Sequence, residues 1–130
     1  MREDEFLARV RERGEYAGQE EAAKVTRDVL AVLGVRITAP EANDLAAQLP
    51  GELGESVARQ DGGAPETFGV EEFLHRVAER TGAHTRTAEW DASAVLSTLA
   101  DSVSGGELNH LISQLPSGYA TFFGKAELSD

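Results

Sequence analysis

The segment DEFLARVRER at residues 4–13 returns almost unchanged as EEFLHRVAER at residues 71–80, at an offset of 67 residues. Further along the chain the offset becomes 66, and AQLP at residues 47–50 matches SQLP at residues 113–116. Matches at many positions in the same order indicate an internal duplication. A repeat of this length limits the possible folds more than any other feature of a sequence.

The spacing of apolar residues predicts that both copies are helical. One stripe in the first copy has the spacing i, i+4, i+7, i+8 and i+11: Ala22, Thr26, Val29, Leu30 and Leu33. The second copy repeats this spacing: Ala88, Ala92, Val95, Leu96 and Leu99. This is the period of a helix and not the alternation of a strand.

Helix starts and stops are also marked. Thr38 with Glu41, and Ser104 with Glu107, have the S/T-x-x-E form of a capping box, which begins a helix. The proline of each QLP segment ends one helix at the preceding leucine and suits the first position of the next. We expect the glutamine of each segment to bond free carbonyl groups nearby.

The sequence therefore predicts an all-α protein, a tandem duplication of a roughly four-helix unit. Residues 1–58 form the first copy, residues 59–69 a linker rich in Gly and Pro, and residues 70–130 the second copy with a short polar tail. The helices are predicted at 3–14, 19–34, 39–49, 51–58, 70–81, 86–102, 105–115 and 117–124. Because a unit of about 55 residues is marginal alone, we expect one compact bundle with a shared core and a pseudo-twofold axis.

These motifs resemble a known family. The EFLxRVxER opening, the VLxxL second helix and the ExxxLxxQLP third helix are similar to the bacterial domain-of-unknown-function family numbered 2267, from Asp4 to about Phe123. The resemblance implies an all-helical cytoplasmic protein of bacteria with no assigned activity. The resemblance assigns no catalytic residue to this sequence.

Composition excludes several classes of partner. Acidic residues outnumber Lys and Arg by 23 to 12, which gives a net charge of −11 and argues against a nucleic-acid partner. The chain has no cysteine, so a disulfide or a Cys-based zinc site is impossible. No secretory signal is visible and no apolar run reaches the roughly 20 residues of a membrane span. We therefore expect a cytoplasmic protein that binds no membrane.

Catalytic and metal motifs are not predicted. His75, His84 and His110 are expected to be surface or packing residues, with a metal ligand as the minor alternative. We identify no H-E-x-x-H motif, no calcium loop and no inward-facing E-x-x-H pairs of the di-iron type. The repeated Arg9 and Arg76 are expected to pair with acids on neighbouring helices, or else to bind an anion. The sequence thus predicts no enzyme, no cofactor and no metal.

The two copies differ at aromatic positions. Trp90 replaces Lys24, and a cluster in the last helix of the second copy replaces smaller residues of the first: Tyr119, Phe122 and Phe123. Trp90 and Phe122 either lie on the surface or fill space between the copies. Exposed aromatic residues favour partner contacts.

The favoured hypothesis is a non-enzymatic protein-interaction module, monomeric or homodimeric, with Trp90, Tyr119 and Phe122 as a possible surface. The alternative is a small-ligand carrier with a closed apolar cavity between the copies, lined by residues such as Trp90 and Phe122. An enzyme that uses His110 with scattered carboxylates is the third hypothesis.

Overall fold

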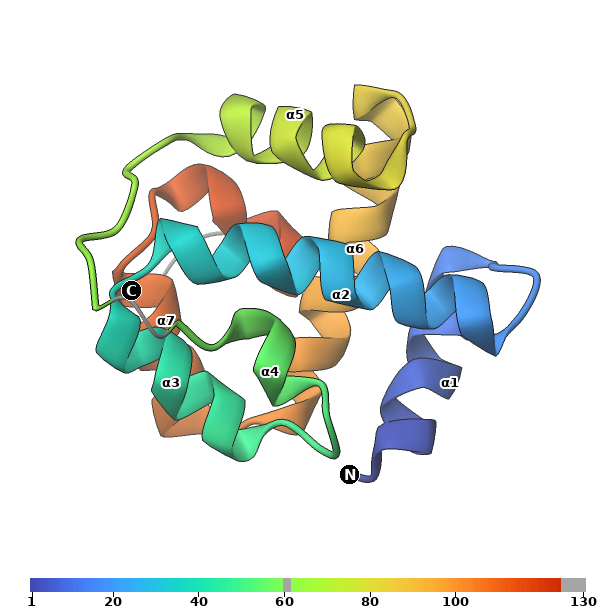
Figure 1. Cartoon of the computed structure of the whole chain (residues 1–130), viewed down its shortest axis with the longest axis horizontal. Coiled ribbons are helices and arrows are strands. Elements are labelled where there is room, and N and C mark those ends of the chain that lie inside the picture. Colours follow the sequence, from blue (N-terminus) through green and yellow to red (C-terminus); the bar gives the residue numbers. More distant parts are fainter. Residues whose placement is uncertain (60–61, 125–130) are drawn as a thin grey trace.

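The computed structural model describes residues 1–59 and 62–124 and is a compact helical bundle (Figure 1). Over these residues it contains eight helices and no strand, which confirms the all-α prediction. Seven are α-helices: α1 (Glu3–Gly14), α2 (Gln19–Arg36), α3 (Ala39–Gln48), α4 (Gly54–Val57), α5 (Val70–Thr81), α6 (Thr85–Ser102) and α7 (Gly105–Ser113). The eighth, η1 (Ser117–Phe123), is a 3-10 helix.

The two longest helices, α2 and α6, contact each other in the middle of the bundle (Figure 1). Helix α1 packs against both of them, and so does α5. The matching phenylalanines of these outer helices, Phe6 and Phe73, are fully buried. The apolar stripes predicted for α2 and α6 supply much of the core between them, because all ten of their residues are fully buried.

The fourth predicted helix of each half differs from the structure. Helix α4 starts at Gly54 and not at residue 51, because Gly51 has a φ of 57°, which a right-handed helix does not accommodate. In the second half, residues 117–123 wind as a 3-10 helix instead of an α-helix. Leu49 and Leu115, the leucines of the two QLP segments, are buried as predicted.

Two of the three aromatic residues of the predicted interaction surface lie inside the protein. The exposed fraction is 0% for Tyr119 and 4% for Phe122. The Phe73 ring lies 5.3 Å from the Tyr119 ring and 6.3 Å from the Phe122 ring, and Tyr119 donates a hydrogen bond to the carbonyl of Phe68. The possible surface role of Tyr119 is corrected here, and of the two alternatives for Phe122 the structure shows the buried one, because both rings complete the core beneath α5.

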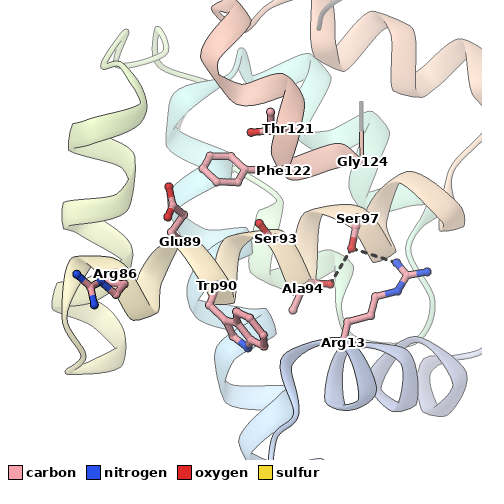
Figure 2. A pocket seen from close by; sticks show the side chains of 10 residues that line it. All are labelled: Arg13, Arg86, Glu89, Trp90, Ser93, Ala94, Ser97, Thr121, Phe122 and Gly124. Carbon is pink, nitrogen blue, oxygen red and sulfur yellow. Dashed lines mark hydrogen bonds between the residues drawn. The ribbon is translucent and has the colours of Figure 1, made fainter. Parts of the chain in front are cut away.

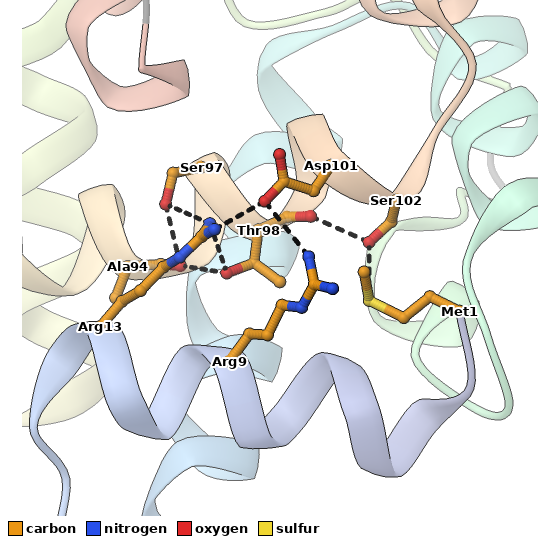
Figure 3. A network of polar contacts seen from close by, with 8 residues as sticks. All are labelled: Met1, Arg9, Arg13, Ala94, Ser97, Thr98, Asp101 and Ser102. Carbon is orange, nitrogen blue, oxygen red and sulfur yellow. Dashed lines mark hydrogen bonds and ion pairs between the residues drawn. The ribbon is translucent and has the colours of Figure 1, made fainter.

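A polar network joins α1 to α6 (Figure 3). The Arg13 guanidinium donates to Asp101 at 2.6 Å and to the hydroxyls of Ser97 and Thr98, and Arg9 lies 3.6 Å from the same Asp101 oxygen. Arg9 therefore pairs with an acid on a neighbouring helix, as predicted.

The second repeated arginine pairs differently. Arg76 forms ion pairs with Glu72 on its own helix and with Glu66 in the segment before α5. Its guanidinium also lies 4.1 Å from the centre of the Phe68 ring. Since carboxylates engage both Arg9 and Arg76, the anion-site alternative has no support from the structure.

In the part of the chain that the structure describes, no helix combines the length and the apolar character needed to cross a membrane.

Close backbone contact between α2 and α4 gives a prediction about stability. A Cβ atom added at Gly34 would lie 2.5 Å from the carbonyl oxygen of Val57. We expect Gly34→Ala to lower the free energy of unfolding by about 1–3 kcal/mol, as overpacking does elsewhere. Urea unfolding followed by circular dichroism measures the change.

Gly106→Ala is the matched control, because a Cβ at Gly106 meets no atom within 4 Å. The free energy of unfolding of this variant should be unchanged or higher by up to about 1 kcal/mol, because alanine has a higher helix propensity than glycine. Equal stabilities for the two variants would contradict the prediction.

Candidate functional site

Trp90, the only tryptophan, lies on the surface of α6 with 51% of its area exposed. Its indole Nε1–H donates a 2.8 Å hydrogen bond to the carbonyl of Gly14, the last residue of α1. The last carbonyls of a helix have no partner within the helix, so they accept bonds from outside it. The end of α1 thus fixes the position of the indole.

An open hollow of about 560 Å³ lies beside Trp90, between α6, η1 and the end of α1 (Figure 2). Phe122 also lines this hollow with the small part of its ring that remains exposed. The structure therefore brings Trp90 and Phe122 together, as the sequence hypotheses require, but does not include Tyr119. The hollow is open to solvent and not the closed cavity that the small-ligand hypothesis expects.

The charged residues around the hollow are mostly basic. Arg13, Arg86 and Glu89 line it. Arg13 is held by Asp101, whereas Arg86 is exposed and forms no ion pair with any described residue. With Arg13 paired to Asp101, Arg86 is the cation of this surface that has no ion-pair partner among the described residues.

A second group of functional side chains lies where α3 meets α7. One possible ligand atom from each of four residues lies within 4.8 Å of the others: Glu41, Asp44, Glu107 and His110. Glu41 and Glu107 come from the first turns of α3 and α7. Asp44 and His110 follow three residues later, so each pair shares one face of its helix.

The capping of α3 and α7 explains why the two glutamates meet. The hydroxyls of Thr38 and Ser104 accept hydrogen bonds from the backbone amides of Glu41 and Glu107, at 3.3 and 3.1 Å. These bonds form the first half of the predicted capping boxes. In a complete box the glutamate side chain would accept the amide of the capping residue in return.

That second half is supplied from across the bundle. The amide of Thr38 donates to Gln114 Oε1 at 3.1 Å, and the amide of Ser104 donates to Gln48 Oε1 at 2.9 Å. The glutamines of the QLP segments therefore accept from amides and bond no carbonyl of the residues that the structure describes, which corrects the sequence expectation. Because the glutamines occupy the amides, the carboxylates of Glu41 and Glu107 are left to face each other.

Glu41 is an unusual residue for a protein interior. It is 1% exposed, and among the described residues neither of its carboxylate oxygens has a hydrogen-bond partner of acceptable geometry. His110 Nδ1 lies 2.7 Å from Glu41 Oε1. Glu107 receives a long 3.5 Å bond from Gln48 Nε2 at its Oε1, while its Oε2 is buried without a partner.

This environment changes the acidity of Glu41. Burial, and after it the neighbouring Glu107 and the charge of Asp44, raise the pKa of the Glu41 carboxyl from 4.5 to about 8. Glu41 is therefore largely protonated at neutral pH. A carboxyl with a strongly raised pKa is a feature shared by functional sites and structural networks.

Sequence reasoning missed this cluster although one signal was available. Glu107-Leu108-Asn109-His110 has the E-x-x-H spacing that we did not identify, and Glu41 with Asp44 repeats the spacing with a second carboxylate. His75 and His84 are not part of the cluster. His75 lies 3.6 Å from Glu79 on its own helix, and His84 precedes α6.

The chain belongs to the family described as "Uncharacterized conserved protein (DUF2267)", whose model matches residues 3–122. This match confirms the family resemblance and assigns no activity. None of the curated proteins compared with the chain matches it.

The pKa of Glu41 gives a prediction about stability and pH. The folded protein keeps a proton on Glu41 that the unfolded chain releases above pH 4.5, so the contribution of Glu41 to stability falls as the pH rises towards about 8. A glutamine at this position cannot ionise, so its contribution to stability does not fall as the pH rises. Between about pH 5 and pH 9, we expect the free energy of unfolding of Glu41→Gln to rise relative to that of wild type. This relative rise should exceed about 1.4 kcal/mol, which corresponds to one pKa unit.

Urea unfolding at the two pH values, with a chelator present, measures this gain. Glu79→Gln removes the same charge from an exposed residue of α5 and should follow wild type. If the free energies of unfolding of wild type and Glu41→Gln change in parallel with pH, Glu41 ionises normally and the prediction is wrong.

Proposed function

We propose that the chain is a non-enzymatic protein-interaction module whose binding surface is the hollow beside Trp90. One observation carries this proposal: the half-exposed indole is already fixed by its hydrogen bond to Gly14. An aromatic ring that is ordered before binding loses little conformational freedom when a partner arrives. Tryptophan is also among the residues that contribute most to binding energy at interfaces.

The hollow suggests the chemistry of the partner. A bulky apolar side chain would fit against Trp90 and the exposed edge of Phe122. An acidic side chain next to it would reach Arg86, which has no ion-pair partner among the described residues. We therefore propose a protein segment with an apolar anchor beside an acidic residue.

A protein segment suits the hollow better than a small ligand. Small-molecule sites cover about 70–90% or more of the ligand surface. The hollow beside Trp90 is open and about 560 Å³ in volume, so it would leave much of a small ligand in water. A side chain anchored to a larger partner does not have this disadvantage, because the rest of the partner covers the opening.

We also infer that the chain consists of two copies of one unit, at residues 1–58 and 70–130, joined by residues 59–69. The exchange of bonds between Gln48 and Ser104 and between Gln114 and Thr38 supports this inference, since the two bonds join matching positions. The packing of α1 on α6 and of α5 on α2 also supports it. An approximate twofold axis near α3 and α7 would produce both features. The proposed setting is the cytoplasm of a bacterium.

Selection of peptides from a displayed library against the whole protein tests the proposed function. We expect enriched peptides with an apolar residue beside an acidic one, and a blue shift of Trp90 emission when they bind. Trp90→Ala should weaken binding by at least about tenfold, and Arg86→Glu by a smaller factor, since hot-spot aromatic residues contribute more than rim charges.

Arg11→Glu is the matched control for the charge change, because Arg11 is exposed on α1 and does not line the hollow. It should leave peptide affinity unchanged. Equal affinity of the selected peptides for wild type and Trp90→Ala would overturn the proposed surface.

A further inference from the structure

We propose that Glu41, Asp44, Glu107 and His110 form a binding site for one divalent transition-metal ion, held between the first turns of α3 and α7. This site lies on helices other than those that form the Trp90 hollow. The proposal goes beyond the protein-interaction function and does not depend on it.

The buried carboxylate of Glu41 is the first support. Outside water a carboxylate needs a charged or hydrogen-bonding partner. Among the described residues, Glu41 Oε1 lies 2.7 Å from His110 Nδ1 without hydrogen-bond geometry, and Glu41 Oε2 has no hydrogen-bond partner. Three oxygens in this small volume, both from Glu41 and one from Glu107, have no hydrogen-bond partner in the described part of the chain. A single cation between the two side chains would compensate all three.

The spacing of the four ligand atoms is the second support. They lie within 4.8 Å of one another. Atoms bound to one ion at about 2.0–2.2 Å lie roughly 3.3–3.6 Å apart in a tetrahedral site and up to about 4.4 Å apart at opposite positions of an octahedral one. The cluster therefore has to close by between a few tenths of an ångström and about 1.5 Å. Asp44 and His110 are exposed and can make this movement, whereas Glu41 is already packed in place.

The types of ligand indicate the class of ion. Three carboxylates and one imidazole suit Mn²⁺, Fe²⁺ or Zn²⁺, because carboxylates bind Mn²⁺ well and imidazole binds Fe²⁺ and Zn²⁺ well. Mg²⁺ and Ca²⁺ prefer ligand sets made of oxygen alone. Helical bundles build such sites from Glu and His residues three positions apart, and each helix here supplies one pair of that spacing.

The surroundings are already organised to hold the ligands. The hydroxyls of Thr38 and Ser104 fix the backbone of the two glutamates, and Gln48 contacts one oxygen of Glu107. Groups that orient a ligand in this way raise metal affinity. Because Asp44 and His110 are exposed while Glu41 is buried, an ion would enter from the side of the solvent and keep water molecules there.

Titration of chelator-stripped whole protein with Zn²⁺ and with Mn²⁺, followed by calorimetry, tests the proposal. We expect one ion per chain, with Mg²⁺ and Ca²⁺ at least about tenfold weaker. Glu41→Gln and His110→Ala should each weaken binding by more than about tenfold, the loss that even an outer-shell change causes. Co²⁺ should give visible absorption bands in wild type and lose them in Glu41→Gln.

The variants are chosen so that loss of folding cannot imitate loss of the site. Glu41→Gln keeps the shape of the side chain and removes a buried ionisable group, so circular dichroism should show it folded. His75→Ala with Glu79→Gln is the matched control, since this exposed pair has the same residue types on one helix. The control should bind as wild type does.

Three outcomes would overturn the proposal. The first is no binding of Zn²⁺ or Mn²⁺ at millimolar concentration. The second is equal affinity in wild type and Glu41→Gln, and the third is an equal loss in the His75 and Glu79 control. Each would mean that the four side chains form only a structural carboxyl cluster.

Discussion

The arrangement of the bundle depends on two backbone amides at the starts of α3 and α7. Each amide needs an acceptor, and each finds it in a glutamine at the end of the other helix, Gln114 for Thr38 and Gln48 for Ser104. The bond of Thr38 is partly buried, so its amide would lose free energy without an acceptor, whereas the bond of Ser104 is exposed and its amide could bond water instead. Once both bonds form, α3 and α7 are fixed against each other. The long helices α2 and α6, which lead directly into them, then meet in the middle of the molecule.

The same exchange creates the unusual chemistry of the α3–α7 contact. In an ordinary capping box Glu41 and Glu107 would each accept their own capping amide and lie along their own helix. Here the glutamines have taken that role, and the two carboxylates meet in a place with little water. Burial, and after it the neighbouring Glu107, raise the pKa of Glu41 to about 8. Places where local sequence rules fail in this way are often functional or strained sites.

Much of the fold follows from sequence patterns that act locally. The apolar period and the helix-ending signals predicted residues 3–14 and 70–81 as they occur, and the QLP prolines end α3 and α7 near the expected places. The failures have a common cause, because they depend on groups far apart in the chain. Nothing near Gln48 shows that its acceptor oxygen will face Ser104. Likewise, an extra aromatic residue such as Phe122 does not reveal whether it faces the solvent or Phe73. The E-x-x-H spacing of Glu107 and His110 is local and could have been found, whereas the burial of Glu41 opposite them could not.

The two sites can act independently, because the contacts between them are weak or distant. Trp90 is fixed by the end of α1, whereas the carboxylate cluster is fixed by the starts of α3 and α7. Helix α6 connects them, and its exposed ion pairs with α1 through Asp101 contribute at most about 1 kcal/mol each. A coupling of that size changes an equilibrium by about fivefold or less, so an ion between α3 and α7 would have little effect on the affinity of the hollow. The cluster instead acts where the two halves of the chain meet. A cation there would take the place of the proton on Glu41 and bind both Glu41 and Glu107, which would add a link between α3 and α7.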